Sequence, residues 1–429
     1  MKLLQALGAL AFAAAGAAAD DAIAVRAGRL VDVDKGQVLR DRVVIVRGER
    51  IESVLDAGAP LPKGARVLDL SGYTLAPGLI DCHTHLVDLV QSASPAAPLE
   101  TSASRQAYIG VKHARATLLA GFTSVRDVGS WRVFSDAALR DAIDEGVVPG
   151  PRMAVAGTYV TTSSGSGDIA GIAPDVVLPP EFRAGIANSA DEVRRRVREL
   201  LNGGADFIKI MATGAVFTRG TRPGVPEFSE AEMRAAVEEA AKYGARVTAH
   251  AHGSEGIQNA IRAGVQSIEH GSLADAAALR LMKERGTYWV PDIYNGDYTA
   301  TEGKRLGWPA DILKKNDDTT ELQRQAFRKG VAMGVRIAFG TDSGIYPHGW
   351  NAKQLPYMVR YGMTPLQALQ AATIEAARNI GWEERVGSLA PGKLADMVGV
   401  EGDGLADVGA FESVAFVMKG GVVYKSPAP

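Results

Sequence analysis

The run GLIDCHTHL (residues 78–86) is the first of eight short apolar segments that alternate with longer amphipathic stretches between about Ala76 and Ile380. The other seven are GFTSVRDV (121–128), RMAVAG (152–157), ADFIKIMA (205–212), ARVTAHAH (245–252), VQSIEHG (265–271), TYWVPDI (287–293) and VRIAFGTD (335–342). Runs of this length predict buried strands. The stretch 229–244 predicts a helix that begins after Ser229 as N-cap, and a last helix is predicted from Thr364 to Ile380.

Eight strand–helix units over residues 76–381 favour an α/β fold of the (β/α)8 type, a TIM-like barrel. A doubly wound parallel sheet is the alternative, but no glycine-rich dinucleotide loop follows the first predicted strand. The flanking segments 20–75 and 382–429 contain short alternating strands separated by Gly and Asp turns. Because chain ends often lie close together, these two segments predict one small β-sandwich.

The N-terminal residues 1–19 are typical of a secretory signal peptide. Lys2 precedes an apolar segment, Leu3 to Ala15, and Ala17-Ala18-Ala19 forms a small-residue cleavage site. We therefore expect cleavage after Ala19 and a secreted or periplasmic protein. A membrane anchor is the alternative, but the apolar segment is shorter than the roughly 20 residues of a spanning helix, and no later segment is predicted to span.

Composition indicates an ordinary folded protein, with 46% hydrophobic and 22% charged residues in a chain of 429. The formal charge of −2 and the lack of a basic stripe argue against nucleic acid as a partner. Cys82 is the single cysteine, so no internal disulfide forms. Its place in an apolar run predicts a buried, inert thiol.

Histidines gather at the ends of the predicted strands. The chain has seven, of which His83 and His85 form one i, i+2 pair and His250 and His252 form another. On a strand this spacing places both side chains on one face. The further strand-end residues are Lys209, His270 and Asp342. In a barrel these ends converge, and such a donor set favours a metal such as zinc. His113 is instead predicted to lie on a helix surface.

Lys209 and Asp342 each allow two interpretations. A lysine inside an apolar strand is costly to bury, so its amine either reaches outward or has a lowered pKa and a function. A neutral amine can react with CO2 to form a carbamate, whose two oxygens can bridge two metal ions. Asp342 either caps the next segment or binds metal and takes a proton from water.

The motifs resemble the amidohydrolase superfamily over nearly the whole chain. The segments that carry the resemblance are PGLIDCHTH (77–85), GADFIKI (204–210), VTAHAHG (247–253), QSIEHGS (266–272), GTDSG (340–344) and APGKLADMV (390–398). Within it, VRDVGS (125–130) and GTDSGIYPHG (340–349) are most similar to the imidazolonepropionase-like branch. That branch includes Xaa-Pro and related dipeptidases and ochratoxin-degrading amidohydrolases.

The resemblance implies two divalent metal ions per chain, expected to be zinc, with a hydroxide between them. It implies that the more buried ion is held by His83, His85 and Asp342, and that the other is held by His250 and His270. It also implies that Lys209, carboxylated by CO2, bridges the two ions. His252 would contact the substrate. Relatives form large homo-oligomers, such as octamers, so we expect a homo-oligomer here. Ser166, within Ser164–Asp168, stands where relatives carry a substrate-contacting His, which leaves the group that supports the oxyanion open.

We therefore predict metal-assisted hydrolysis of an amide or peptide bond next to a C-terminal amino acid, with Asp342 as general base. Dipeptides, N-acyl amino acids and ochratoxin A are the expected substrate class. Arg219 and Arg222, in VFTRGTRPG (216–224), either bind the substrate carboxylate or are solvated loop charges. The alternatives are a cyclic-amide hydrolase, a mononuclear deaminase, which would not need Lys209, and a secreted solute-binding protein, which would need two lobes.

Overall fold

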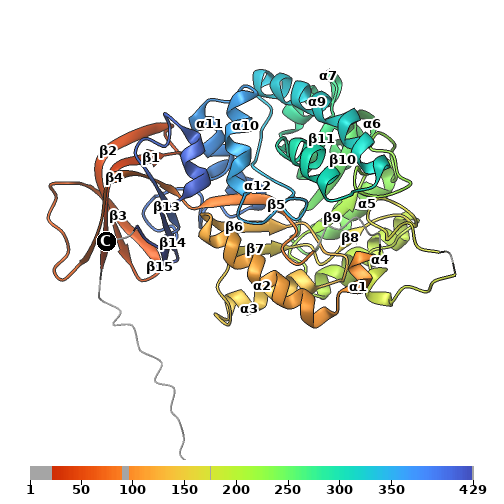
Figure 1. The fold of residues 1–429 in the computed structure, drawn as a ribbon, viewed down its shortest axis with the longest axis horizontal. Helices are drawn as coiled ribbons and strands as arrows, with labels where there is room; N and C mark the ends of the chain where they lie inside the picture. Colours follow the sequence, from red (N-terminus) through yellow and green to blue (C-terminus); the bar gives the residue numbers. More distant parts are fainter. Residues whose placement is uncertain (1–21, 89–95, 174, 428–429) are drawn as a thin grey trace, which may run out of the picture.

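The computed structural model describes residues 22–88, 96–173 and 175–427, so the predicted signal peptide lies outside the described residues. Both ends of the described chain build one seven-stranded sheet (Figure 1, left). Its order is β15-β14-β13-β4-β1-β2-β3; β1 and β4 are parallel, and the other neighbours are antiparallel. The strands are β1 (Ile23–Asp32), β2 (Gln37–Arg47), β3 (Arg50–Asp56), β4 (Arg66–Pro77), β13 (Met397–Glu401), β14 (Phe416–Lys419) and β15 (Val422–Lys425).

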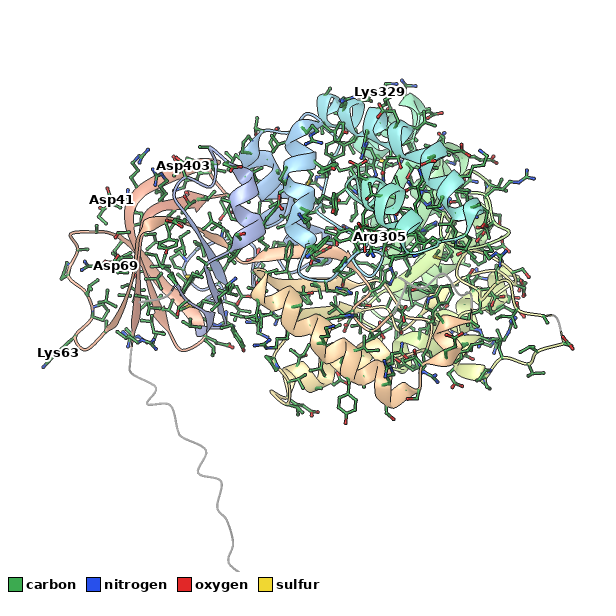
Figure 2. All side chains as sticks on the ribbon, viewed as in Figure 1. Asp41, Lys63, Asp69, Arg305, Lys329 and Asp403 are labelled. Atoms are coloured by element: carbon green, nitrogen blue, oxygen red, sulfur yellow. The ribbon has the colours of Figure 1, made fainter. Side chains whose placement is uncertain are left out.

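Alternating apolar side chains hold this sheet together. Val25, Val44, Leu70, Met397 and Phe416 belong to one buried cluster, although they come from both ends of the chain. The predicted pairing of the two ends is therefore confirmed as a shared sheet, whereas the two-layered sandwich stays a prediction. Charged side chains such as those of Asp41 in β2 and Lys63 in the turn before β4 are exposed (Figure 2).

The middle of the chain contains parallel strands in two sheets, with orders β5-β6-β7 and β12-β11-β10-β9-β8. In both sheets the strands follow the chain order, without the reversal that marks a doubly wound sheet. They are β5 (Leu79–Thr84), β6 (Phe122–Asp127), β7 (Arg152–Val155), β8 (Tyr159–Val160), β9 (Ile208–Met211), β10 (Val247–Gly253), β11 (Ser267–Leu273) and β12 (Tyr288–Val290). Seven of the eight predicted strands are present, and β8 is an addition.

The eighth predicted strand, 335–342, is not a regular strand. It makes isolated parallel bridges, from Ile337 to Trp289 of β12 and from Ser343 to Thr84 of β5. Asp342, within it, has a φ of +57°, which breaks the extended conformation. The segment nevertheless lies between the two parallel sheets and is hydrogen bonded to both.

Helices follow most of the parallel strands and cover them (Figure 1, right). They are α1 (Ala97–Glu100), α2 (Ala103–Leu119), α3 (Ser135–Asp144), α4 (Ala190–Asn202), α5 (Glu230–Ala241), α6 (Ser254–Ala263), α7 (Ala276–Arg285), α8 (Asn295–Tyr298), α9 (Ala310–Met333), α10 (Gln354–Arg360), α11 (Pro365–Ala371) and α12 (Ile374–Ile380). Ser229 caps α5 through a capping box with Glu232, which confirms the predicted helix start.

The predicted helix from Thr364 to Ile380 is divided into α11 and α12. Thr373 has φ −136° and ψ −95°, and its hydroxyl donates to the Leu369 carbonyl oxygen at 2.6 Å. A threonine that bonds back to the carbonyl four residues earlier competes with the helix ladder, which accounts for the break.

Two further sequence predictions concern burial. Cys82 is fully buried, and burial raises the pKa of its thiol to about 12. Within the described ranges, every helix is too short or too polar to cross a membrane.

Candidate metal-binding active site

The strand-end residues singled out in the sequence meet in one cavity. Its lining includes His83, His85, Lys209, His250, His252, His270 and Asp342. All seven are buried, none exposing more than 8% of its surface. The two His pairs come from β5 with the residue after it and from β10, so the alternation of a strand directs both members of each pair inward.

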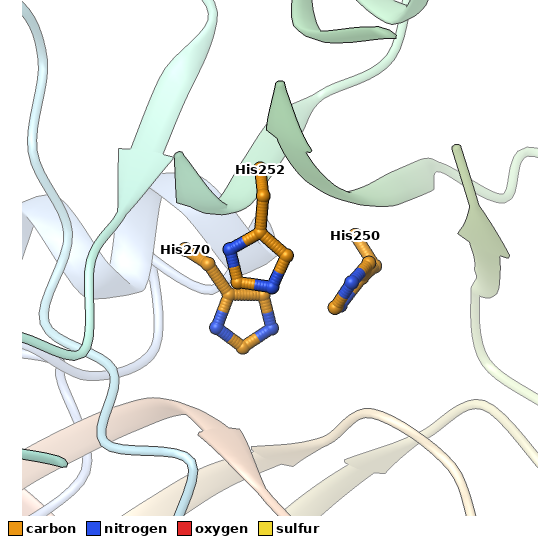
Figure 3. Close-up of side chains that lie close together, drawn as sticks. All are labelled: His250, His252 and His270. Carbon is orange, nitrogen blue, oxygen red and sulfur yellow. The ribbon is translucent and has the colours of Figure 1, made fainter. Parts of the chain in front are cut away.

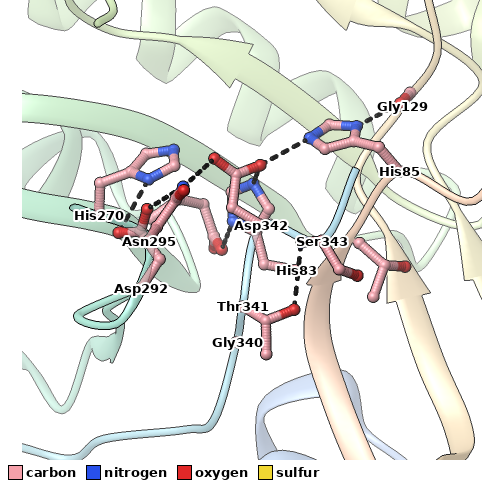
Figure 4. A network of polar contacts seen from close by, with 12 residues as sticks. His83, His85, Gly129, His270, Asp292, Asn295, Gly340, Thr341, Asp342 and Ser343 are labelled. Carbon is pink, nitrogen blue, oxygen red and sulfur yellow. Dashed lines mark hydrogen bonds and ion pairs between the residues drawn. The ribbon is translucent and has the colours of Figure 1, made fainter. Parts of the chain in front are cut away.

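His83, His85 and Asp342 form the first donor cluster (Figure 4). The Nε2 atoms of His83 and His85 lie 3.5 and 3.2 Å from Asp342 Oδ1. The Nδ1 of His85 lies 2.8 Å from the Gly129 carbonyl oxygen, which only accepts, so Nδ1 carries the proton of a neutral ring. In that tautomer the Nε2 lone pair faces a carboxylate oxygen.

A lone pair and a carboxylate oxygen repel each other unless a cation, either a proton or a metal ion, lies between them. Burial opposes protonation of His85, yet the hydrogen bond and charge of Asp342 raise its pKa to about 9. In His83 burial prevails, and the neighbouring Lys209 adds to it, so its pKa lies well below the ordinary value. Two imidazole nitrogens and one carboxylate oxygen within 4.8 Å of one another fit a divalent ion such as zinc.

The second cluster contains His250, His252 and His270 (Figure 3). Their ring centroids lie 4.6 to 4.9 Å apart, and the His252 and His270 rings are stacked. Burial, and then the charge of His270, hold the pKa values of His250 and His252 well below the ordinary value. Their rings are therefore neutral, and each can offer a nitrogen lone pair to a metal ion. The geometry makes His252 a candidate ligand as well as a candidate substrate contact.

Lys209 lies among these donors on β9. Its side chain is 2% exposed, and burial lowers its pKa to about 8. The lower pKa increases the share of neutral amine at neutral pH, and the neutral amine is the form that reacts with CO2. The outward-reaching amine considered from the sequence is therefore not observed.

Backbone conformation sets this site apart. His270 and Asp342 are two of the five described non-glycine residues with positive φ, at +66° and +57°. A positive φ is costly for such residues and persists where the surrounding structure imposes it. Both residues line the cavity.

Asp292, which was not predicted as a site residue, also lines the cavity. Its Oδ1 lies 3.2 Å from His270 Nδ1 and accepts from Gln323 Nε2 at 2.7 Å, while Asn295 Nδ2 donates to both Asp292 Oδ2 (3.1 Å) and Asp342 Oδ2 (3.3 Å). Burial would raise the Asp292 pKa, but the charge of His270 outweighs it, so the pKa lies below the ordinary value. The available signal was the position of Asp292 at the end of a predicted strand, as for Asp342.

The remaining lining is largely apolar and uncharged. The cavity is open to solvent at its mouth, so a small-molecule ligand can reach the buried histidines. Its apolar wall includes Trp131, Tyr159, Met211, Val216, Phe217 and Ile345, and Asn316, Thr319 and Thr320 of α9 add neutral polar groups.

Ser166 lines the same cavity and is buried. Its Oγ lies 2.8 Å from both the Thr213 carbonyl oxygen and Glu227 Oε2, and its backbone N–H donates to the same Glu227 oxygen at 2.8 Å. The hydroxyl is thus already engaged by the protein.

Three residues considered from the sequence lie outside the cavity lining. Arg219 and Arg222 are exposed and outside the cavity lining. The hydroxyls of Thr218 and Thr221 bond to backbone groups of Ser166 and Ala215 and turn the loop so that the threonines are buried instead. His113 lies on α2 as predicted but is half-buried, with Nδ1 2.8 Å from the Leu86 carbonyl oxygen.

The chain is similar to known proteins over nearly its whole length. The chain is 33% identical to ochratoxinase of Aspergillus niger, over 94% of this chain and 86% of that enzyme. A crystal structure of a Xaa-Pro dipeptidase with methionine in its active site superposes with a TM-score of 0.89, at 37% identity over 95% of this chain and 100% of that one. A prolidase complexed with N-methylphosphonate-L-proline gives 0.86, at 32% identity over 94% and 100%. The Amidohydrolase family pattern matches residues 74–424, and the chain therefore belongs to the amidohydrolase family.

Proposed function

We propose that the protein is a metal-dependent hydrolase that cleaves the amide or peptide bond next to a C-terminal amino acid. Its family membership supports hydrolysis of an amide bond. The convergence of two buried histidine clusters on one cavity is the observation that carries the metal dependence. The substrate class is drawn from relatives that are named ochratoxinase, Xaa-Pro dipeptidase and prolidase.

The fold proposed for this function is a closed eight-stranded barrel, which the strand bridges support. Cys82 N–H donates to the Phe339 carbonyl oxygen at 2.9 Å, and Ala338 N–H donates to that of Trp289 at 2.9 Å, so segment 335–343 joins β5 to β12. At the other side, Asp206 N–H donates to the Val155 carbonyl oxygen at 2.8 Å and connects β7 to the residues before β9. Closure would bring all eight carboxyl ends to one mouth.

Two divalent ions are proposed, held by the residues that the cavity already groups. His83, His85 and Asp342 would bind one, His250 and His270 would bind the other, and carboxylated Lys209 would bind both. When bound, the ions polarise the scissile carbonyl and lower the pKa of a water molecule. His252 is proposed to contact the substrate through Nε2, since its Nδ1 lies 2.9 Å from Ser272 Oγ and a two-metal site held by the other residues does not need it.

Asp342 is proposed as the general base, and its surroundings suit that role. Oδ1 faces the donor histidines, while Oδ2 accepts from Asn295 Nδ2 at 3.3 Å, which fixes the plane of the carboxylate. Asp342 then takes the proton from the attacking water and delivers it to the leaving amine. Asp292 holds His270 through Nδ1 in the same way that Gly129 holds His85.

The apolar wall supports a substrate with a bulky, uncharged acyl group or side chain. Trp131, Phe217 and Ile345 offer surface for an aromatic or aliphatic group, such as the acyl group of ochratoxin A. A carboxylate next to the scissile bond would distinguish this class from cyclic amides. Because Arg219 and Arg222 are outside the cavity, neither is proposed to bind that carboxylate.

The test is a substrate screen with metal-loaded enzyme. We expect hydrolysis of N-acyl amino acids or dipeptides, with kcat/KM more than tenfold higher for the free acid than for its C-terminal amide, since a hydrogen bond from the neutral polar lining to a charged carboxylate is worth about 1.5–3 kcal/mol. Asp342→Asn should lower kcat by about 10²–10⁴-fold, whereas the exposed Asp311→Asn should not change it. Preferred hydrolysis of a cyclic amide, or equal rates on acid and amide, would refute the proposed specificity.

A further inference from the structure

Glu269 and Arg126 form a buried ion pair directly behind His83, outside the cavity lining. Glu269 lies on β11 with 0% of its surface exposed, and Arg126 lies on β6 with 4%. Burial of an ion pair often adds little to stability, because desolvation of both charges offsets their attraction. Stability alone therefore does not explain an ion pair at this position.

The two oxygens of Glu269 have different partners. Oε2 lies 2.8 Å from His83 Nδ1. Oε1 accepts from Arg126 Nη2 at 2.6 Å, from Ser267 Oγ at 2.8 Å and from the Thr248 hydroxyl. Three donors thus hold one oxygen in place, and the other oxygen is directed at the imidazole ring.

Arg126 also fixes the backbone beside His83. Its Nε donates to the Cys82 carbonyl oxygen at 2.7 Å, and its Nη1 donates to Ser267 Oγ at 3.0 Å. Through these bonds Arg126 links β5, β6 and β11. His83 is thereby held twice, through its ring by Glu269 and through the preceding peptide group by Arg126.

We propose that Glu269 and Arg126 are positioning residues that orient His83 for metal binding. A carboxylate oxygen only accepts hydrogen bonds, so the contact with Glu269 places the imidazole proton on Nδ1. The lone pair then lies on Nε2, which is the atom 3.5 Å from Asp342 Oδ1. A carboxylate behind a ligating histidine fixes the tautomer and raises the basicity of the ligand. This inference rests on the metal dependence of the proposed function.

The test compares metal retention in three variants by competition with a chelator for zinc. Glu269→Gln should weaken the affinity of the ion that His83 holds by about 10- to 100-fold, as for other residues that support a metal ligand. Glu239→Gln is the matched control, because Glu239 is also buried and bonded to an arginine, Arg198 Nε at 2.7 Å, but lies on the outer helix α5. It should retain wild-type affinity.

The double variant Arg126→Met/Glu269→Gln removes both charges, so neither is left buried without its partner. It therefore separates the positioning of His83 from the cost of an unpaired buried charge. Affinity that stays at least tenfold below wild type supports positioning, and affinity within about threefold of wild type overturns it. A second measurement needs neither variant nor metal: ¹⁵N-histidine NMR of the metal-free wild-type protein should show His83 protonated at Nδ1. A proton at Nε2 overturns the inference, whereas a wild-type protein that binds no metal refutes the proposed function instead.

Discussion

Replacing Lys209 with methionine should stabilise the metal-free protein. The same substitution should abolish the activity of the metal-loaded protein. Methionine keeps an apolar, unbranched side chain in a position that is 2% exposed, so the packing changes little. The substitution removes a buried amine whose pKa falls from 10.5 to about 8, with burial as the main cause. At about 1.4 kcal/mol per pKa unit, the protonated amine costs the folded state about 3 kcal/mol at pH 7.

The pH dependence of this difference has a definite sign. The folded-state pKa of Lys209 is lowered, so the cost is fully present below pH 8 and disappears as the pH rises toward 10.5. The stability advantage of Lys209→Met should therefore be about 3 kcal/mol at pH 7 and about 1 kcal/mol or less at pH 10. Urea denaturation of the metal-free proteins in CO2-free buffer measures both values.

Activity should change in the opposite direction. Lys209 is proposed to bind both metals, and such a residue should matter more than one that only supports a ligand, so kcat/KM should fall by more than about a hundredfold. Lys329→Met, on the exposed face of α9 (Figure 2), is the matched control and should alter neither quantity, its stability effect staying within about 0.5 kcal/mol. A Lys209→Met protein that is less stable than wild type at pH 7, or that remains active, would refute the assignment of Lys209 as a destabilising functional residue.

Three further predictions concern residues around this centre. Cys82 should resist alkylation in the native protein, because burial raises its pKa to about 12, and should react after unfolding; rapid labelling of the native thiol would contradict this. Arg219→Gln and Arg222→Gln should each change kcat/KM by less than about twofold, since both arginines are exposed, and a selective loss of activity on the free acid would place one of them in the site. His252→Asn should lower kcat/KM by more than about tenfold while the metal content by elemental analysis stays that of wild type; loss of a metal ion would make His252 a ligand.

The features best predicted from the sequence are those that follow from the two-residue repeat of a β-strand. A strand repeats every two residues, so the spacing of His83 and His85 alone indicates that both face one side, and the structure places them so. The same periodicity identified seven of the parallel strands. It could not show that 335–342 is irregular, because the positive φ of Asp342 is imposed by its surroundings rather than by its own residue type.

The strand repeat could not predict which loop side chains are buried or which single polar residues reach the site. Arg219 and Arg222 were candidates for a carboxylate contact, but hydrogen bonds of Thr218 and Thr221 decide which side chains of that loop are buried. Asp292 was overlooked because an aspartate after a strand is also common in turns. No sequence pattern points to Glu269 as a partner of His83, because their contact joins strands far apart in the sequence.

Elemental analysis of the purified protein tests the central claim most directly. The account predicts about two divalent ions per chain, expected to be zinc, and loss of amide hydrolysis when a strong chelator removes them, with recovery on adding zinc back. Protein that hydrolyses its substrate at an unchanged rate with no bound metal would contradict it.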